Sequence, residues 1–374
     1  MKIGTPSLLI PQNILPPDAE NLAVYDGDNK ICDIPLGHLS PPDMGEKLYS
    51  VGLLSDSHVT SSSNTNDSMT DFPRALQYYN DVVDFVCMCG DGVDTGTDSN
   101  FELYKSCIDT NLPDIPIYSI TGNHETYTGG DPYRHEEDVL KSLMRTYAKV
   151  PLYYTVSSNP TTELNADGVI ADGGNIYNAS VGDDVYIMLG IARDYVHFGA
   201  GTGTLQWLYE TLETNRNKRC FIFEHIRPDD ASGNGDNLHW TDLWGEDTNI
   251  VKVFTSLLKH YKNVIFFHGH SHFTLELQTR TNLANIDEIY GRYSVHVPSL
   301  TYPRGYPLTD EGRPTNLVNK SEGYVMDVYA DHVILRGRDF VASNWITVAQ
   351  YCLPMALQTV QAGTYTDDTG LIVT

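Results

Sequence analysis

The sequence is short of basic residues. It contains 24 lysines and arginines against 49 aspartates and glutamates, which gives a formal net charge of −25 at pH 7. Such a charge repels phosphate backbones, and no segment rich in lysine or arginine offsets it. The composition therefore disfavours a protein that binds long nucleic acids, and it suits a site that gathers divalent cations.

Cysteine is also sparse and lacks metal-binding spacing. The six cysteines form no Cys-x-x-Cys pair, and Cys87 and Cys89 stand in the apolar run VDFVCMCG. Small buried residues of a core strand explain this pair better than a thiolate metal site does. Nothing in the spacing predicts a disulfide framework.

Long hydrophobic runs are missing as well. No segment approaches the ~20 consecutive apolar residues of a membrane-spanning helix. The N-terminal stretch MKIGTPSLLIPQNILPPDAE has one early lysine, but prolines interrupt its short apolar pieces, so it is a poor signal peptide. No membrane span is expected and a cytoplasmic location is favoured, while the compartment and the oligomeric state stay open.

The rest of the composition is typical of a globular protein with a large core, with 41% hydrophobic and 20% charged residues. Residues 1–47 are rich in proline and weakly periodic, so we expect an extended arm or a small β appendage there. The main domain is predicted at 48–342. It includes a polar insertion at about 126–180, and a C-terminal extension follows at 343–374.

From residue 48 onward, apolar segments of strand type alternate with helix-like segments. Strands are expected at 48–56, 85–91, 115–123, 184–192, 219–225 and 263–270, and helices at 72–84, 100–112, 205–216 and 249–261. Nearly continuous apolar strands between helices are typical of a sheet buried on both faces, so the α/β class is predicted. Three β-type stretches without intervening helices then follow, RYSVHVPSL, EGYVMDVYA and HVILRGRDF.

Polar side chains gather where the apolar strands end. The strands are followed by DSH at 56–58, GDGVD at 90–94, GNHE at 122–125, a lone histidine at 225 and GHSH at 269–272. Ligands of layered α/β sheets bind outside the carboxyl ends of the strands, so we expect these groups to converge. The expected set is Asp56, His58, Asp91, Asn123, His225, His270 and His272.

This set has the chemistry of a metal site. Carboxylates, imidazoles and an amide oxygen suit Mn²⁺, iron or Zn²⁺ rather than thiolate-seeking metals. Seven groups are too many for one tetrahedral ion, but they suit two ions ~3.5–4 Å apart that share a bridging carboxylate. The glycines that precede Asp91, Asn123 and His270 fit turns that need a positive φ or a close backbone approach.

The ordered motifs resemble those of the calcineurin-like metallophosphoesterase superfamily, whose pattern is DxH, GDxxD, GNH(D/E), H and GHxH. The resemblance covers about residues 50–300. It implies a four-layer α/β/β/α sandwich as the catalytic domain at 48–342, flanked by the Pro-rich N-terminal arm and a β-rich C-terminal extension.

The resemblance also implies how the residues divide between two metal ions, divalent or trivalent and either Mn, Fe or Zn. One ion would be held by Asp56, His58, Asp91 and His272, and the other by Asp91, Asn123, His225 and His270. Asp91 would bridge the ions. A water between them would ionise to a hydroxide that attacks phosphorus.

Residues around the predicted ligands receive supporting roles. The resemblance lets His124 contact the phosphate and protonate the leaving oxygen, which suits a histidine pKa near neutrality. Glu125 is expected to orient that imidazole, and Asp94 to act as a turn or supporting carboxylate. Arg227 and Arg304 are candidates for binding substrate phosphate, although a solvated or structural arginine is the simpler interpretation of each.

Two departures qualify the resemblance, and one histidine falls outside its pattern. The stretch GDGVDTG has no tyrosine of the kind that the purple acid phosphatase branch supplies to iron. Thr95 stands where phosphoprotein phosphatases carry an arginine, which disfavours protein phosphatase activity. His268 fits no position of the pattern and is expected to pack behind the site rather than to bind metal.

Three functions remain open at this point. The main hypothesis is a metal-dependent phosphodiesterase or phosphatase acting on a small or wall-derived phosphoester. A nuclease is the first alternative, and the charge of the chain favours a small substrate over a long polyanion. A non-catalytic structural or binding module of a larger assembly is the second, and the complete ligand set argues against it.

Overall fold

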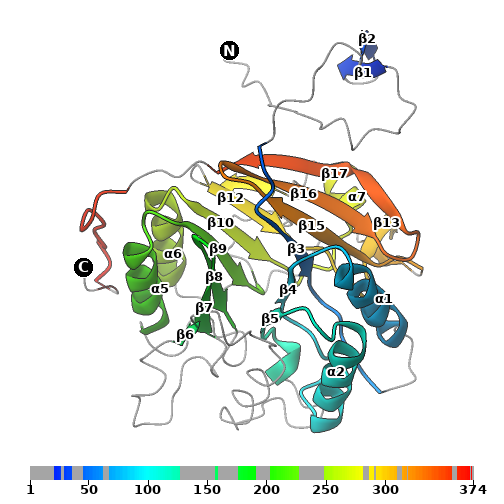
Figure 1. Ribbon diagram of the computed structural model, residues 1–374, viewed down its shortest axis with the longest axis horizontal. Coiled ribbons are helices and arrows are strands. Elements are labelled where there is room, and N and C mark those ends of the chain that lie inside the picture. The colour runs from blue at the N-terminus through cyan, green and yellow to red at the C-terminus, as the bar shows by residue number, and fades with distance from the viewer. Residues whose placement is uncertain are drawn as a thin grey trace.

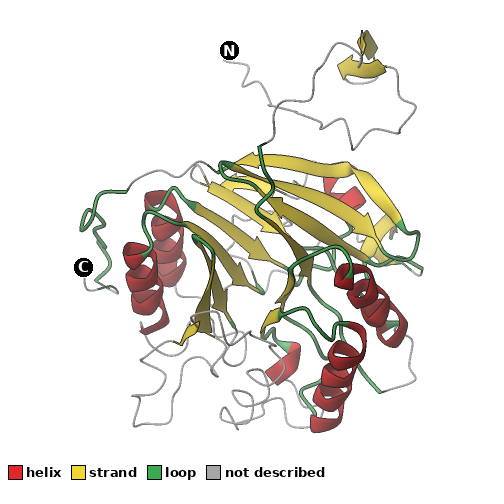
Figure 2. Ribbon diagram, viewed as in Figure 1, coloured by secondary structure: helices red, strands yellow, loops and turns green. Residues whose placement is uncertain are grey.

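The computed structural model consists of two β-sheets that lie face to face, with helices on their outer sides (Figures 1 and 2). It describes residues 21–26, 29–35, 45–61, 67–126, 156–158, 176–190, 203–226, 248–280, 286–289, 292–309, 314–317, 319–355, 360–370 and 372. Helices α1 and α2 cover one sheet, and α5 and α6 cover the other. The predicted α/β class and layered arrangement are confirmed.

The first sheet has six strands in the order β17-β16-β15-β3-β4-β5. Its parallel part is β3 (Tyr49–Leu54), β4 (Phe85–Cys89) and β5 (Ile117–Ile120), and its antiparallel part is β15 (Glu322–Val328), β16 (His332–Asp339) and β17 (Asn344–Pro354). The parallel strands are connected through α1 (Ser68–Asn80) and α2 (Asp98–Asn111). Thr97 begins α2 by accepting a hydrogen bond from the Asn100 amide, which satisfies one of the free N–H groups of the first turn.

The second sheet has seven strands in the order β11-β12-β10-β9-β8-β7-β6. Its parallel strands are β8 (Asp184–Leu189), β9 (Arg219–Glu224), β10 (Val264–His268) and β12 (Arg292–His296). Antiparallel strands complete both sides, namely β6 (Val156–Ser158), β7 (Ile176–Val181) and β11 (Ile286–Ile289). The covering helices are α5 (Gly203–Thr214) and α6 (Thr248–His260).

Smaller elements complete the described chain. They are the hairpin of β1 (Asn21–Asp26) and β2 (Asn29–Pro35), the short helices η3 (His124–Thr126) and α7 (Leu275–Arg280), and the hairpin of β13 (Arg304–Leu308) and β14 (Pro314–Asn316). No helix among these described segments is long and apolar enough to cross a bilayer.

Two segments that the sequence marked as an insertion and an extension pair with the main sheets. Strand β6 and most of β7 lie within the predicted insertion at 126–180, and β17, in the predicted C-terminal extension, pairs with β16. Strands at or next to a sheet edge carry mixed polar and apolar residues, so the alternation that marks a buried strand is weak in them. The helix-like piece predicted at 136–150 lies outside the described residues, and the boundaries at 47 and 342 stay predictions.

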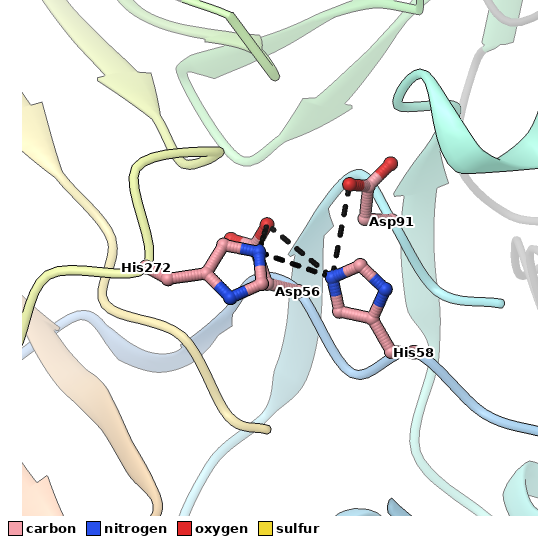
Figure 3. A group of neighbouring side chains, drawn as sticks. All are labelled: Asp56, His58, Asp91 and His272. Carbon is pink, nitrogen blue, oxygen red and sulfur yellow. Dashed lines mark hydrogen bonds and ion pairs between the residues drawn. The ribbon is translucent and has the colours of Figure 1, made fainter. Parts of the chain in front are cut away.

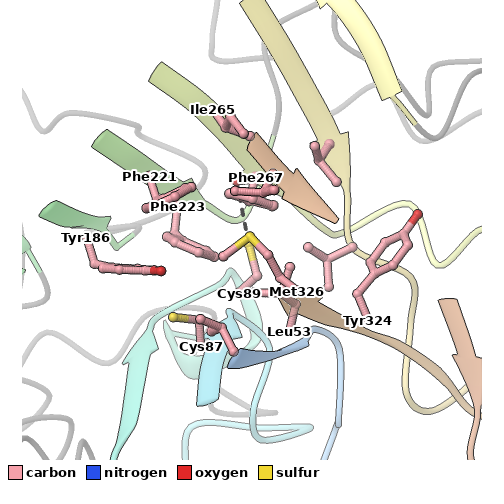
Figure 4. Close-up of a cluster of buried hydrophobic side chains, with 14 of the residues drawn as sticks. Leu53, Cys87, Cys89, Tyr186, Phe221, Phe223, Ile265, Phe267, Tyr324 and Met326 are labelled. Carbon is pink, nitrogen blue, oxygen red and sulfur yellow. Dashed lines mark hydrogen bonds between the residues drawn. The ribbon is translucent and has the colours of Figure 1, made fainter. Parts of the chain in front are cut away.

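Apolar side chains fill the space between the two sheets (Figure 4). On β4, Phe85, Cys87 and Cys89 face this space, while Val86 and Met88 face the helices, as strand alternation requires. Both cysteines are free thiols with no solvent exposure. Burial raises the pKa of both, so they behave as small apolar residues, as predicted.

A buried ion pair within the second sheet forms hydrogen bonds with the first sheet. The Nε and Nη2 atoms of Arg219 on β9 each donate a hydrogen bond of 2.6 Å to Asp184 on β8. The hydroxyl of Tyr49 on β3 donates to the same carboxylate, and Arg219 also donates to the carbonyl of Tyr329, just beyond β15. Asp184 is 2% exposed, so its charge depends on these partners.

Replacing Arg219 is expected to destabilise the protein strongly. Arg219→Ala leaves a buried carboxylate without its counter-charge, which should lower the free energy of unfolding by about 3–5 kcal/mol. Lys105→Ala, which removes an exposed ion pair with Asp109, is the control and should cost under about 1 kcal/mol. Urea denaturation followed by circular dichroism measures both, and equal losses would contradict a sheet-connecting role for Arg219.

Candidate metal centre

The loops that follow five core strands meet at one edge of the two sheets. The segment after β3 lies beside the segment after β4. The amides of Asp56 and His58 donate to the carbonyls of Gly90 and Asp91, at 3.1 and 3.0 Å. Across the gap between the sheets, the His270 amide donates to Asp56 Oδ2 at 3.1 Å. The convergence expected from the strand ends is therefore present.

Among the described residues, three groups of potential ligand atoms form at this edge: two of them share Asp91, and the third is His58, Asp94 and His124. Within each group the candidate atoms all lie within 4.8 Å of one another. The first group is Asp56, His58, Asp91 and His272, and the second is Asp91, His225 and His270. Figure 3 shows the first group, in which the two imidazoles and two carboxylates point toward one another. Asn123 lines the same cavity as both groups.

Short contacts between lone-pair atoms characterise the first group. His272 Nε2 lies 3.1 Å from Asp56 Oδ1 and 3.1 Å from His58 Nε2. His58 Nε2 also lies 3.8 Å from Asp91 Oδ2. Two imidazole nitrogens and two carboxylate oxygens at such distances repel one another unless a proton or a cation lies between them.

The outer ring nitrogens of these histidines face the protein. His225 Nδ1 lies 2.7 Å from the Cys89 carbonyl, and His272 Nδ1 lies 3.3 Å from the Tyr302 carbonyl. A carbonyl only accepts, so Nδ1 carries the hydrogen and Nε2 keeps its lone pair for the centre. This is how metal-binding histidines are held.

Buried atoms of the centre lack conventional partners. Asp56 Oδ1, Asp91 Oδ2 and His225 Nε2 have no partner in hydrogen-bond geometry among the described residues. His225 Nε2 instead faces Asp91 Oδ2 at 3.1 Å. Buried polar atoms of this kind are costly unless an ion satisfies them, so the residues present fit a bound metal.

The carboxylates make the centre strongly negative. Burial alone would lower the pKa of His225, but the charges of Asp91 and Asp56 raise it to about 10. Burial likewise opposes ionisation of Asp91, yet His225 and His124 hold its pKa well below the usual range. The same negative potential that stabilises a proton on imidazole attracts a divalent cation.

Left-handed backbone conformations cluster at the centre. Five of the seven predicted ligands have positive φ, namely Asp56 (+54°), His58 (+44°), Asp91 (+51°), His270 (+70°) and His272 (+60°). Such conformations cost of order 1–3 kcal/mol each and persist where the surrounding structure enforces them. Here they turn the side chains of successive motif residues into one centre.

The glycines before Asp91, Asn123 and His270 are required, as predicted. Gly90 has φ of +86°. A Cβ on Gly122 would lie 2.1 Å from Asp91 Oδ1, and one on Gly269 would lie 1.9 Å from the Ser55 hydroxyl. No side chain fits at the latter two positions without moving the residues that form the centre.

Glu125 has a different role from the one expected. Its carboxylate does not hold the His124 ring; it accepts four backbone hydrogen bonds, from the amides of Asp91, Gly92, Val93 and Gly122. Burial is the main cause, and the charge of Asp91 the next, of a rise in the pKa of Glu125 to about 7. Glu125 therefore fixes the loop after β4 to the loop after β5, and with it the position of Asp91.

His124 lies outside the two groups that share Asp91, and it forms the third candidate group with His58 and Asp94. Its ring meets that of His58 edge-on at 4.5 Å, and its Nδ1 donates to the Asp94 carbonyl at 2.7 Å. Asp94 supports the centre in a second way, since its carboxylate lies 3.6 Å from His58 Nδ1. Burial lowers the pKa of His124, but the charge of Asp91, the hydrogen bond to the Asp94 carbonyl and the charges of Glu125 and Asp94 together raise it above the usual value.

A cavity of about 340 Å³ opens onto the centre. Its far wall is formed by Tyr302, Arg304 and Asn316, and Arg304 pairs with Asn316 in the β13–β14 hairpin. The sequence named Arg304 but missed Tyr302 and Asn316. Tyr302 stands two residues before Arg304 in TYPRGYP, so the sequence could have named it together with Arg304. Asn316 reaches the cavity only through the pairing of β13 with β14, which the sequence does not reveal. Arg227 lies outside the described residues.

His268 packs away from the centre, as expected. It belongs to the side of β10 that carries Val264 and Phe266, which face helices α5 and α6. Its ring lies 5.6 Å from that of Phe266 and 5.5 Å from that of His296.

A sequence model of the calcineurin-like phosphoesterases matches residues 49–274. The chain belongs to this family. It is a metallophosphoesterase, a hydrolase of phosphoric esters, and its cluster of histidines and aspartates is able to bind metal.

Solved structures with related folds include a purple acid phosphatase from yellow lupin (Lupinus luteus) seeds. It shares 14% identity with the metallophosphoesterase at a TM-score of 0.53, over 87% of this chain and 58% of that one. GAP50, the anchor in the inner membrane complex of Plasmodium, gives 10% identity and a TM-score of 0.44 over 86% and 92%. The lupin structure establishes a shared fold only. A search of the curated proteins finds no match.

Adding a methyl group at Gly122 is expected to damage the centre selectively. Gly122→Ala places a carbon against Asp91 Oδ1, so bound metal should fall by about 10-fold or more, as for other changes behind metal ligands. Gly182→Ala is the control, because that glycine has φ of +59° but nothing within 4 Å of its Cβ position. Elemental analysis after dialysis measures the effect, and equal metal content in both variants would refute it.

Proposed function

We propose that this metallophosphoesterase hydrolyses small phosphoesters with two metal ions held at the edge of its sheets. The observation that supports this most directly is the pair of ligand groups that meet at Asp91. A carboxylate shared between two such groups is the arrangement that lets two ions act on one phosphoryl group.

The proposed ligands follow the two groups. One ion would be held by Asp56, His58, Asp91 and His272, and the other by Asp91, Asn123, His225 and His270. Nitrogen and oxygen donors without thiolates favour Mn, Fe or Zn. When bound, the ions would supply a water nucleophile at neutral pH and positive charge for the phosphoryl oxygens.

The protein's own groups prepare this chemistry. Glu125 holds the backbone of Asp91 in place, and the carbonyls of Cys89 and Tyr302 fix the rings of His225 and His272. These contacts are formed before any substrate arrives, so no reorganisation is needed when charge develops.

His124 is proposed as the proton donor to the leaving oxygen. Because Nδ1 donates to the Asp94 carbonyl, Nε2 is the nitrogen available for proton transfer. The raised pKa favours the protonated ring near neutral pH, which is the form that a general acid needs.

The cavity supports a small substrate. Arg304 places a cation beside the centre, and Tyr302 adds an aromatic surface, so together they suit a phosphate with a compact organic group. The net charge of −25 opposes a long polyanion, which makes a nuclease the weaker alternative.

Metal reconstitution with hydrolysis of a generic phosphoester tests the proposal. We expect about two ions per chain and turnover of bis-p-nitrophenyl phosphate or p-nitrophenyl phosphate with Mn²⁺ present. Asp91→Asn should lose both metal and activity, because the amide cannot replace the shared anionic ligand. Asp81→Asn, at the exposed end of α1, is the matched control. Full activity in Asp91→Asn, or no bound metal in the parent protein, would overturn the mechanism.

His124→Ala separates proton donation from metal binding. We expect kcat to fall by ~10²–10⁴-fold while metal content is retained, because His124 is in neither of the two groups that share Asp91. His260→Ala on α6 should leave kcat unchanged. Loss of metal in His124→Ala would show that the residue is a ligand.

A further inference from the structure

A buried serine and histidine support the loop that carries two of the proposed ligands. Ser271 stands between His270 and His272, and its hydroxyl lies 2.7 Å from Nε2 of His296. Ser271 is 5% exposed and His296 is not exposed at all. Neither residue belongs to a metal group or lines the cavity.

The Ser271 hydroxyl also has a backbone partner. The Phe273 amide donates to the Ser271 hydroxyl oxygen at 3.4 Å. Toward Nε2 of His296 the hydroxyl is donor or acceptor according to the tautomer of the ring, and the contact forms in both cases. His296 ends β12, where it pairs with His268 of β10, so the loop is fastened to the sheet itself.

The loop needs such a fastening, because its shape is costly. His270 and His272 both have left-handed φ angles, a conformation that residues other than glycine adopt only where the surrounding structure enforces it. The two histidines also serve different groups, since His272 lies with Asp56 and His270 lies with His225. A small rotation of the loop would therefore misdirect both at once.

We propose that Ser271 and His296 are positioning residues that hold His270 and His272 in the geometry of the two-metal centre. This proposal rests on the proposed function, because it takes both histidines as metal ligands. Holding the two histidines in place should raise the affinity for metal, although neither Ser271 nor His296 contacts the metal itself.

Metal affinity is the quantity that tests the proposal. Ser271→Ala is expected to weaken binding of Mn²⁺ or Zn²⁺ by about 10–100-fold in competition with a chromophoric chelator, as for other groups that orient metal ligands. Thermal unfolding with chelator present should shift little, because only one hydroxyl is lost. At saturating metal, kcat should return toward the parent value.

Ser294→Ala is the matched control. Ser294 is equally buried on β12, two residues before His296, and lies outside the 269–274 loop. Its removal should leave metal affinity within about twofold of the parent, whereas Ser271→Ala should not.

Variants of His296 add a rescue experiment. His296→Met fills the space without a strong acceptor and should weaken metal binding as Ser271→Ala does. His296→Gln places an amide oxygen near the former Nε2 and should restore most of the affinity. The double variant Ser271→Ala/His296→Met should be no weaker than either single variant, because one contact is lost in each case.

The outcomes separate this proposal from the one it rests on. A parent protein that binds no metal overturns both. A parent that binds metal while Ser271→Ala binds it equally well overturns only the positioning role. Equal losses in Ser294→Ala and Ser271→Ala would likewise overturn it, because general repacking of β12 would then be the cause.

Discussion

The burial of two carboxylates, Asp56 and Asp91, at the junction of two sheets is the constraint on which the rest of the centre depends. Both side chains are essentially unexposed, and isolated charges in such a place are prohibitively costly. The surrounding residues either neutralise them or hold them in position. The histidines direct Nε2 at them, backbone amides fix their outer oxygens, and the lone pairs left at the centre are those that a cation satisfies.

The two-sheet architecture explains why the centre forms at all. Each carboxylate comes from the first sheet, while His225, His270 and His272 follow strands of the second. The interface between the sheets is packed with large apolar side chains, so their relative position is rigid. Contacts such as His270 to Asp56 then join the two sets of loops directly. The packing of the hydrophobic core thus sets the geometry of the polar site at its edge.

Much of this site was predictable because each ligand follows an apolar strand directly in the sequence. The motif glycines were predictable for the same local reason. The role of Glu125 was not, since its four amide partners are fixed by how two loops fold around it. Asn316 and the Ser271–His296 contact depend on hairpin and strand pairing across many residues. Strand β7 was missed, and the β-rich C-terminal extension was not expected to pair β17 with the main sheet, because such pairing is set by the fold rather than by the local pattern.

Strain and affinity are connected in this centre. Five proposed ligands in left-handed conformations, at roughly 1–2 kcal/mol each, hold a sum comparable to the ~5–15 kcal/mol net stability of a typical domain. Such a sum is tolerated only where other interactions enforce it. Glu125 does so beneath Asp91, and the Ser271–His296 contact does so beneath His270 and His272. The free-energy cost of the left-handed conformations is therefore met when the chain folds rather than when the metal binds. A metal ion then meets ligands that are already oriented.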